Sequence, residues 1–295
     1  MRELAVSVTG LRKRYGGVTA VDGLDLGIRR GEVFGLLGPN GAGKTTTVEI
    51  LQGHRSRDGG EVTVLGRDPA AGNRRWRSRI GVVWQDESAP AELTVRETVS
   101  HFAHYYPAPR DPDEVIELVG LRSKANDRVG ALSGGQRRRL DVALGVIGRP
   151  ELLLLDEPTT GFDPAARRQF WSLIRLLAGE GTTIVLTTHY LDEAEALADR
   201  IAVITRGRVV AEGSTDVLRE RYGARAAVAW TDLDGTRRHE HTTTPTRTVV
   251  DLAQRLGGEL PGLTITRPTL EDVYLRLTEQ DDTGRAADTP RGGAS

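Results

Sequence analysis

The segment Gly38–Thr46, Gly-Pro-Asn-Gly-Ala-Gly-Lys-Thr-Thr, constrains the rest of the chain more than any other part of the sequence. It follows the short apolar run Val33–Leu37 and precedes a stretch with helical periodicity. A strand, a glycine-rich turn and a helix in this order form the context in which G-x-x-x-x-G-K-[ST] indicates a phosphate-binding loop. The glycines let consecutive N–H groups point at one anion, and the helix adds the positive end of its dipole.

Individual residues of this loop have separate expected roles. Lys44 is expected to reach the β- and γ-phosphates of a nucleotide, and the Thr45 hydroxyl is expected to ligate Mg²⁺. The alternative interpretation is a glycine-rich turn before a helix that binds nothing. The candidate phosphate-binding residues are Gly38, Pro39, Asn40, Gly41, Ala42, Gly43, Lys44, Thr45 and Thr46.

Composition excludes several other classes of protein. The net charge of the 295 residues is −1, so no overall basic field suggests nucleic acid as a partner. The absence of cysteine excludes disulfides and cysteine-based metal sites. No apolar run approaches the roughly 18–20 residues that a membrane span needs, and the first residues lack the apolar core of a signal peptide. We therefore expect a soluble, cytoplasmic chain that needs another polypeptide for any membrane span.

The beginning of the chain predicts two antiparallel strands. Apolar residues alternate with polar ones over residues 4–8 and 24–28, which is typical of half-buried strands. Tyr15 lies between the two stretches. It is either a surface aromatic residue or a flat face on which an adenine ring stacks.

Two carboxylates follow the most apolar run of the chain. Leu152–Leu155 predicts a strand buried on both faces, as in a parallel sheet, and Asp156 and Glu157 come directly after it. They would lie beside the phosphate loop if the two strands were neighbours. Asp156 suits Mg²⁺, directly or through water, and Glu157 suits a general base that deprotonates water. The alternative is an acidic turn without function.

Two more polar side chains follow buried runs. Ile80–Trp84 predicts a buried strand with Gln85 at its carboxyl end. Thr183–Leu186 predicts another, with His189 at its carboxyl end. Ligands of open parallel sheets bind at the carboxyl ends of strands. Gln85 would thus reach Mg²⁺ or the attacking water, and His189 would donate to the γ-phosphate. The alternatives are a polar loop residue and a structural histidine.

Residues 86–145 predict an inserted helical subdomain. Thr94–Glu97 is a capping-box pattern at the start of a helix. Three aromatic residues near the end of that helix indicate either core packing or a docking surface for a partner; they are Phe102, Tyr105 and Tyr106.

A second anion-binding motif opens a later helix. Ser133 stands where an N-cap belongs, and two glycines after it expose backbone N–H groups. The following arginines, Arg137–Arg139, are the polar residues of this helix, and Arg138 is expected on a solvated face. The five residues of this motif are Leu132, Ser133, Gly134, Gly135 and Gln136.

Over roughly residues 4 to 215, the chain resembles the ATP-binding subunit of ABC transporters. Two residues differ from those usual in this family: Phe162, where leucine is commoner in the D-loop, and Arg138, where many relatives carry glutamine. The resemblance implies an α/β fold, that of a P-loop NTPase: a RecA-like, mostly parallel core with an antiparallel β subdomain and the inserted helical subdomain. It rests on Gly38–Thr46 (Walker A), Gln85 (Q-loop), Leu132–Gln136 (signature), Leu152–Glu157 (Walker B and catalytic Glu), Thr160–Asp163 (D-loop) and His189 (switch His).

The resemblance also implies roles that residues alone leave open. Tyr15 and the phosphate loop would bind ATP, and Mg²⁺ would be held by Thr45, Gln85 and Asp156. Two copies of the chain would sandwich two ATP molecules head to tail, so that Ser133 and Gly135 complete the site of the partner copy. A separate polytopic membrane permease would contact the Q-loop and the helical subdomain. Through these contacts it would respond to closure of the dimer with ATP and to its release after hydrolysis. Catalysis would involve Lys44, Gln85, Glu157 and His189, with Asp163 in the D-loop.

The ATP-binding domain is expected over residues 1–217. The sequence pattern changes after it and predicts a small α/β accessory domain over 222–278. Alternating apolar residues, a hairpin signal at Asp234-Gly235 and a final helix over Pro268–Leu277 support it. Its end resembles the ATP-binding subunits of daunorubicin- and doxorubicin-resistance exporters. A brace for the dimer and a ligand sensor are the two interpretations, and 279–295 is expected to be a disordered tail.

The main prediction is therefore an ATP-hydrolysing subunit on the cytoplasmic face of the cell membrane that powers export of a drug, antibiotic or lipid-like substrate. The alternative is a soluble ABC ATPase that acts on ribosomes or nucleic acid. One phosphate loop, one signature, no sustained heptads and no basic patch disfavour that alternative.

Overall fold

The computed structural model of the chain describes residues 3–84, 90–222 and 226–286. Two compact units, Met1–Ser214 and Thr215–Ser295, divide it. Within the described ranges, no helix is both long enough and apolar enough to cross a membrane.

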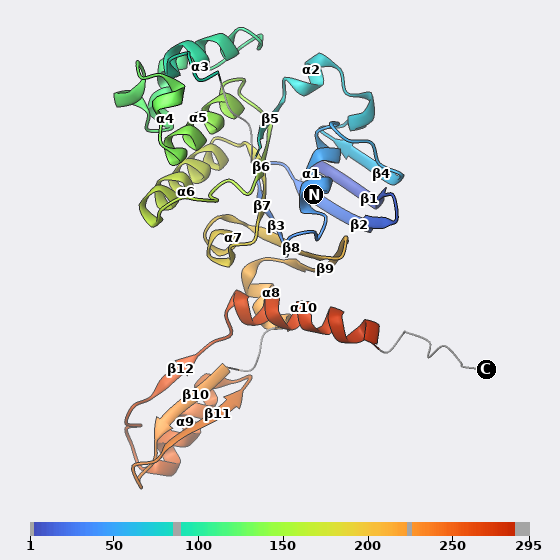
Figure 1. Ribbon diagram of the computed structural model, residues 1–295. Coiled ribbons are helices and arrows are strands. Elements are labelled where there is room, and N and C mark those ends of the chain that lie inside the picture. The colour runs from blue at the N-terminus through green and yellow to red at the C-terminus, as the bar shows by residue number, and fades with distance from the viewer. Residues whose placement is uncertain (1–2, 85–89, 223–225, 287–295) are drawn as a thin grey trace, which may run out of the picture. The chain divides into compact units, whose positions relative to one another are not determined.

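A six-stranded sheet forms the centre of the first unit (Figure 1). Its strand order is β5-β6-β7-β3-β8-β9, and every neighbouring pair is parallel except β8 and β9. The strand β7 thus separates the strand before the phosphate loop, β3, from the strand before the acidic pair, β6. The strands are β3 (Val33–Leu37), β5 (Ile80–Val83), β6 (Leu152–Asp156), β7 (Thr183–Thr188), β8 (Arg200–Thr205) and β9 (Arg208–Gly213).

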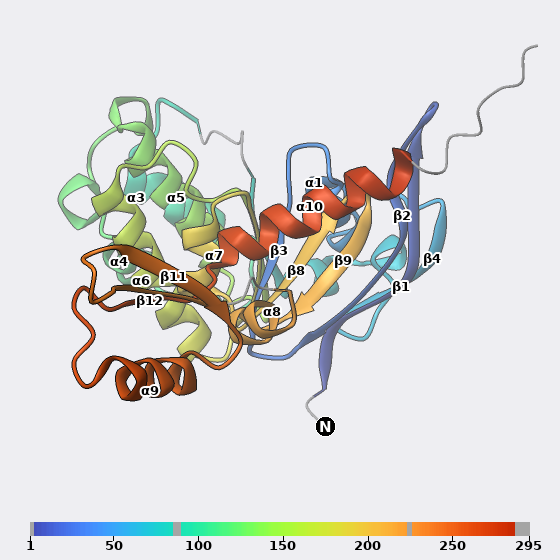
Figure 2. The same cartoon turned by 90° about the horizontal axis from the view of Figure 1, so that it is seen from below.

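The apolar run of β6 faces two different cores. Successive side chains of a strand point to opposite faces of a sheet. Leu152 and Leu154 accordingly pack with α1 and the antiparallel strands, whereas Leu153 and Leu155 pack with the helices of the other side. Figures 1 and 2 show α1 and the helices α3–α6 on opposite sides of the sheet. All four consecutive leucines are buried because this strand is covered on both faces, as predicted.

An antiparallel sheet, in the order β2-β1-β4, packs over α1. The first two strands match the alternating stretches of the sequence, with Val6, Val8, Leu26 and Ile28 buried. Its strands are β1 (Leu4–Tyr15), β2 (Val18–Arg29) and β4 (Gly59–Val64).

The helices begin where the sequence supplies caps. Thr94 and Glu97 form the predicted capping box of α3, and Asp111 caps α4. Near the end of α3, Phe102 and Tyr106 pack against the core, whereas Tyr105 is exposed. The helices are α1 (Lys44–Leu51), α2 (Arg74–Arg77), α3 (Val95–Ala103), α4 (Pro112–Leu118), α5 (Gly134–Val146), α6 (Pro164–Gly179) and α7 (Leu191–Leu197), with the short 3₁₀ turns η1 (Pro69–Ala71), η2 (Arg122–Lys124) and η3 (Val129–Ala131).

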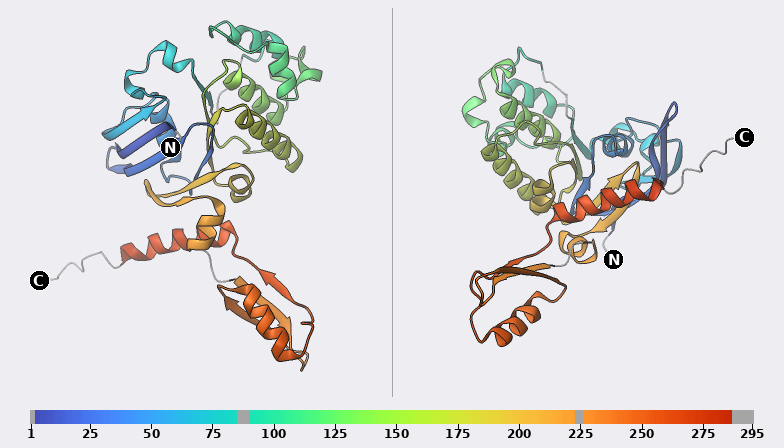
Figure 3. Two further views of the ribbon diagram at one scale, coloured as in Figure 1. Left: turned by 180° about the vertical axis from the view of Figure 1, so that it is seen from behind. Right: turned by 60° about the horizontal axis from the view of Figure 1, so that its bottom comes forward.

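The C-terminal unit contains a sheet in the order β11-β10-β12, and α9 covers one of its faces (Figure 3). Val228, Trp230 and Leu252 form its buried core. The helix α10 runs to Ala286, past residue 279, where the expected tail begins, and residues 287–295 lie outside the described ranges. The elements are α8 (Thr215–Tyr222), β10 (Ala226–Thr231), β11 (Arg237–Thr242), α9 (Pro245–Leu256), β12 (Thr264–Thr266) and α10 (Leu270–Ala286).

Candidate functional site

The phosphate loop connects β3 to α1 and needs glycine at two positions for steric reasons. A Cβ on Gly38 would lie 2.2 Å from the carbonyl oxygen of Ile204. A Cβ on Gly43 would lie 2.3 Å from the carbonyl oxygen of Ala20, and Gly43 also has a φ of 100°, in the left-handed region. Gly43 is the N-cap of α1, so the unpaired N–H groups of this helix open toward the loop.

Lys44 is buried within this loop. Its side chain is 5% exposed, and Nζ donates to the carbonyl oxygens of Gly38, at 2.8 Å, and Pro39, at 3.1 Å. Burial lowers the pKa of Lys44, and the nearby carboxylates of Glu157 and Asp156 oppose this effect. The ammonium group therefore lies in a site that favours an additional anion.

Asp156 lies at the end of β6, next to the start of α1. It is 2% exposed, and its Oδ1 is 3.4 Å from Oγ1 of Thr45 and accepts a hydrogen bond from Oγ1 of Thr187. Thr187 belongs to β7, the strand between β3 and β6. The side chains of this intervening strand thus connect the two halves of the site.

Glu157 lies between the phosphate loop and the switch histidine. Its Oε1 is 3.7 Å from Nζ of Lys44 and 3.3 Å from Nδ1 of His189. The backbone of Glu157 has a φ of 44°, which is strained for a non-glycine residue, and its N–H donates to Oγ1 of Thr187 at 3.0 Å. Three predicted site residues from three strand ends therefore meet here.

Tyr15 is 39% exposed at the end of β1. The guanidinium carbon of Arg55 lies 5.1 Å from the centre of its ring, and Nζ of Lys13 lies 5.6 Å from it. An exposed ring flanked by cations is suited to stacking on a base that carries phosphates.

The signature motif lies on the other side of the sheet, at the start of α5 (Figure 1). Ser133 caps the helix, and it forms a capping box with Gln136. Among the described residues, no hydrogen bond or ion pair joins Leu132–Gln136 to Lys44 or Glu157. The structure brings together the predicted Walker and switch residues but leaves the signature apart from them.

The prediction that Arg138 lies on a solvated face is wrong. It is 8% exposed, because its guanidinium reaches main-chain carbonyl groups beyond α5. Arg138 shares a helix face with the buried residues Val142 and Gly145, at i+4 and i+7, and this spacing is the sequence signal that would have revealed it.

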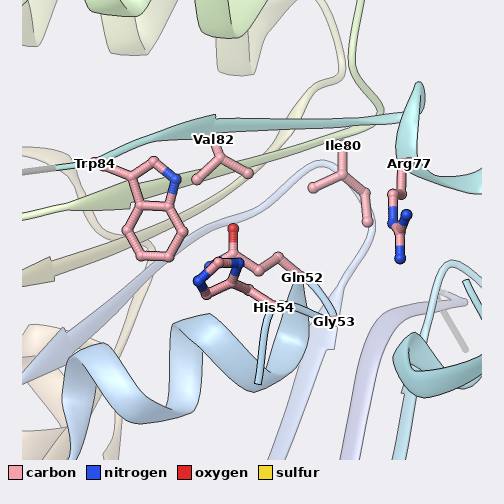
Figure 4. A pocket seen from close by; sticks show the side chains of 7 residues that line it. All are labelled: Gln52, Gly53, His54, Arg77, Ile80, Val82 and Trp84. Atoms are coloured by element: carbon pink, nitrogen blue, oxygen red, sulfur yellow. The ribbon is translucent and has the colours of Figure 1, made fainter. Parts of the chain in front are cut away.

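Two other predicted positions have different outcomes. Asp163 caps α6, because its Oδ1 accepts hydrogen bonds from the N–H groups of Ala165 and Ala166. Gln85 lies outside the described residues. A cleft of about 460 Å³ lies beside Trp84, and in Figure 4 the side chains of Trp84 and Gln52 both face this cleft.

Sequence analysis also missed Thr187 and Glu193. Thr187 lies just beyond the predicted run Thr183–Leu186 and has no predicted role, although its hydroxyl bonds to both acidic residues. Glu193, in the first turn of α7, is fully buried, and neither carboxyl oxygen has a hydrogen-bond partner among the described residues. Glu193 precedes the buried Ala194 and lies four residues before the buried Leu197, and this spacing is the sequence signal that indicates its burial.

The fold and the site define an ATP-binding cassette with a Walker-type nucleotide site. A profile of the ABC transporter family matches residues 21–160. The chain is 41% identical to the daunorubicin resistance ATP-binding protein DrrA3 of Streptomyces coeruleorubidus, over 95% of this chain and 98% of that protein. It is also 41% identical to the Nod factor export ATP-binding protein I of Rhizobium sp. (strain N33), over 95% and 99% of the two chains.

Solved structures agree with this assignment. The cbiO1 protein of Clostridium perfringens, part of the ABC transporter complex cbiONQ, matches with a TM-score of 0.67 and 28% identity, over 75% of this chain and 93% of that one. A dimeric ATP-binding cassette, in a post-hydrolysis state with ADP and Pi, matches with a TM-score of 0.64 and 25% identity, over 71% and 98%. The chain belongs to the ATP-binding proteins of the ABC transporter family, and it is an ATPase.

Proposed function

We propose that two copies of this chain close head to tail around two ATP molecules and that hydrolysis reopens them. The glycines of the signature support this arrangement. A Cβ on Gly134 or Gly135 would meet no atom within 4 Å, and neither residue has a positive φ. Glycine is therefore not needed there for the fold of this chain, unlike Gly38 and Gly43, and a ligand that approaches the backbone closely explains it better.

Glu157 would act as the general base in this proposal. Its carboxylate oxygen lies between Lys44 and His189, at the open side of the phosphate loop, which is the single observation that carries the proposal. Lys44 would hold the γ-phosphate, and His189 would orient Glu157 and donate to the phosphate. The signature amides of the partner copy would stabilise the charge that develops on the phosphate.

Hard oxygen ligands of the kind that Mg²⁺ prefers are present beside the loop. Thr45 and Asp156 would hold the ion together with phosphate oxygens, and Gln85 is the third proposed ligand. When bound, Mg²⁺ would neutralise charge on the β- and γ-phosphates.

The transport role rests on the relatives. Proteins named for daunorubicin resistance and for Nod factor export match along almost the whole chain. We therefore propose an exporter subunit that acts on a drug, antibiotic or lipid-like substrate through a separate polytopic membrane permease, at the cytoplasmic face of the membrane and without nucleic acid. The cleft beside Trp84 is the proposed contact for that permease (Figure 4). The C-terminal unit, with a proposed domain over residues 222–278, would brace the dimer.

Glu157→Gln is the variant that tests the chemistry. It should bind ATP, hydrolyse it at least about 100-fold more slowly, as loss of a general base predicts, and accumulate as an ATP-bound dimer in size-exclusion chromatography with light scattering. Hydrolysis at the wild-type rate would exclude Glu157 as the base.

Gly135→Ala in the Glu157→Gln background tests the sandwich. Alanine raises helix propensity by about 1 kcal/mol, so the free chain should melt at a higher temperature. The same methyl group should prevent the ATP-dependent dimer. A variant that still dimerises with ATP would show that the signature does not face the nucleotide of the partner copy.

A pull-down with tagged Glu157→Gln from ATP-treated, detergent-solubilised cells tests the partner. A polytopic membrane protein in near-equal amount is the expected result. Ribosomal proteins or nucleic acid without a membrane protein would favour the soluble class instead.

A further inference from the structure

The buried arginine of the signature helix makes contacts that the proposed chemistry does not use. Arg138 lies in α5, five residues after the N-cap Ser133, and is 8% exposed. Its Nε donates to the carbonyl oxygen of Pro158 at 3.0 Å, and its Nη2 donates to that of Asp156 at 2.9 Å. Its Nη1 donates to the carbonyl oxygen of Trp84. One side chain thus binds the backbone at the ends of two strands.

The three carbonyl groups are placed next to the residues that the reaction needs. Asp156 and Pro158 are the two neighbours of Glu157 in the chain. Trp84 directly precedes Gln85. The guanidinium of Arg138 therefore clamps the peptide backbone on both sides of the proposed base and at the start of the Q-loop.

The geometry of guanidinium suits this task better than any other side chain. Arginine presents five N–H donors in a rigid, planar fork, so it can bond to several acceptors with fixed relative positions. Glutamine offers only two N–H donors, and lysine offers a flexible point charge. The backbone of Glu157 is itself strained, at a φ of 44°, and persists only if its surroundings hold it.

We propose that Arg138 is a positioning residue that fixes the backbone of Glu157 and links it to the signature helix. Since α5 also carries Ser133–Gln136, engagement of the signature with ATP would be transmitted by the same helix to the loop that holds the base. This inference rests on the proposed role of Glu157. In this role Arg138 acts through the backbone carbonyl groups that it binds, on both sides of Glu157.

Arg138→Gln is the primary variant. If the clamp positions the base, kcat should fall on the order of 10–100-fold, as a displacement of about 1 Å does in other sites. KM for ATP should stay within about threefold, because the phosphate loop is untouched. Arg138→Lys keeps the cation and one or two of the bonds, and its kcat should lie between those of Arg138→Gln and the wild type. It also decides the question if Arg138→Gln does not fold.

Arg139→Gln is the matched control. Arg139 is the next residue of the same helix, but its Nη2 donates to the side chain of Gln169 on α6 and not to the site. The control loses an arginine and a hydrogen bond of α5, and its kcat should equal that of the wild type. Melting temperatures of all variants, measured without nucleotide, separate loss of folding from loss of positioning.

A dimerisation assay distinguishes positioning from a general defect of α5. The double variant of Arg138→Gln with Glu157→Gln should still form the ATP-dependent dimer, because closure does not need the base. The inference is overturned if Arg138→Gln keeps kcat within about twofold of the wild type. It is equally overturned if Arg139→Gln lowers kcat as much, or if the double variant no longer dimerises. Hydrolysis by Glu157→Gln at the wild-type rate would instead refute the proposed function, independently of the Arg138 results.

Discussion

Thr187→Val should slow ATP hydrolysis far more than it weakens nucleotide binding. Thr187 is fully buried at the end of β7. Its hydroxyl donates to Oδ1 of Asp156 and accepts from the backbone N–H of Glu157 at 3.0 Å. Valine has nearly the same shape and removes both hydrogen bonds, so the variant tests the hydroxyl and not the packing.

The expected loss can be worked out from these two bonds. A hydrogen bond to a charged group such as the Asp156 carboxylate contributes about 1.5–3 kcal/mol. The second bond contributes less, because the N–H of Glu157 also reaches the carbonyl oxygen of Thr187 at 3.2 Å. We expect a total loss of roughly 2–4 kcal/mol in the free energy of unfolding. The strained backbone of Glu157 would then relax, and a shift of about 1 Å in its carboxylate costs on the order of 100-fold in kcat.

Phosphate release at saturating and limiting ATP, together with denaturant unfolding, measures both effects. Thr183→Val, at the other end of the same strand, is the control. The Thr183 hydroxyl accepts one bond, from the N–H of Gly31 at 3.0 Å, so the control should lose only about 1 kcal/mol and keep its kcat. Equal kcat values for the two variants, at a temperature where both are folded, would refute the proposed role of the Thr187 hydroxyl.

Two further predictions concern a buried acid and an exposed ring. Burial raises the pKa of the Glu193 carboxyl above its ordinary value of 4.5, and the charge of Arg167 counteracts this only in part. The folded carboxyl thus holds its proton more tightly than the unfolded one, so the free energy of unfolding falls as pH rises from about 4.5 through the raised pKa. Glu193→Gln should remove this loss, and melting curves that stay parallel to those of the wild type at every pH would contradict it. Tyr15→Ala should raise KM for ATP about 10-fold with little change in kcat, as loss of base stacking predicts, whereas Tyr15→Phe should bind ATP like the wild type in a fluorescent-nucleotide titration.

The parts of the fold that depend on neighbouring residues could be predicted from the sequence. The strand over Leu152–Leu155, the capping box at Thr94 and the N-cap at Ser133 all follow from local patterns. Each pattern specifies its own hydrogen bonds or its own buried faces within a few residues. That is why they were found without knowledge of the rest of the chain.

The parts that depend on distant residues could not be predicted. The order of strands is one example, because nothing in β3 or β6 shows that β7 lies between them and contributes Thr187 to both acidic residues. The burial of Arg138 is another. A guanidinium is buried only where acceptors are supplied for it, and three carbonyl acceptors of Arg138 belong to residues 18, 20 and 54 positions away. The identity of those acceptors is a property of the tertiary structure.

The two buried cations of the site, Lys44 and Arg138, bind the same kind of acceptor with different consequences. Strand ends and tight turns leave carbonyl oxygens without partners in the sheet, and both side chains donate to such oxygens. Lys44 does so inside the phosphate loop, where burial lowers its pKa and an arriving phosphate would offer a stronger, charged acceptor. Arg138 lies behind the loop of Glu157, where its acceptors belong to the protein itself. Lys44 would therefore exchange its hydrogen-bond partners in each ATP cycle. Arg138 would keep its own partners and hold Glu157 at a fixed position relative to the signature helix.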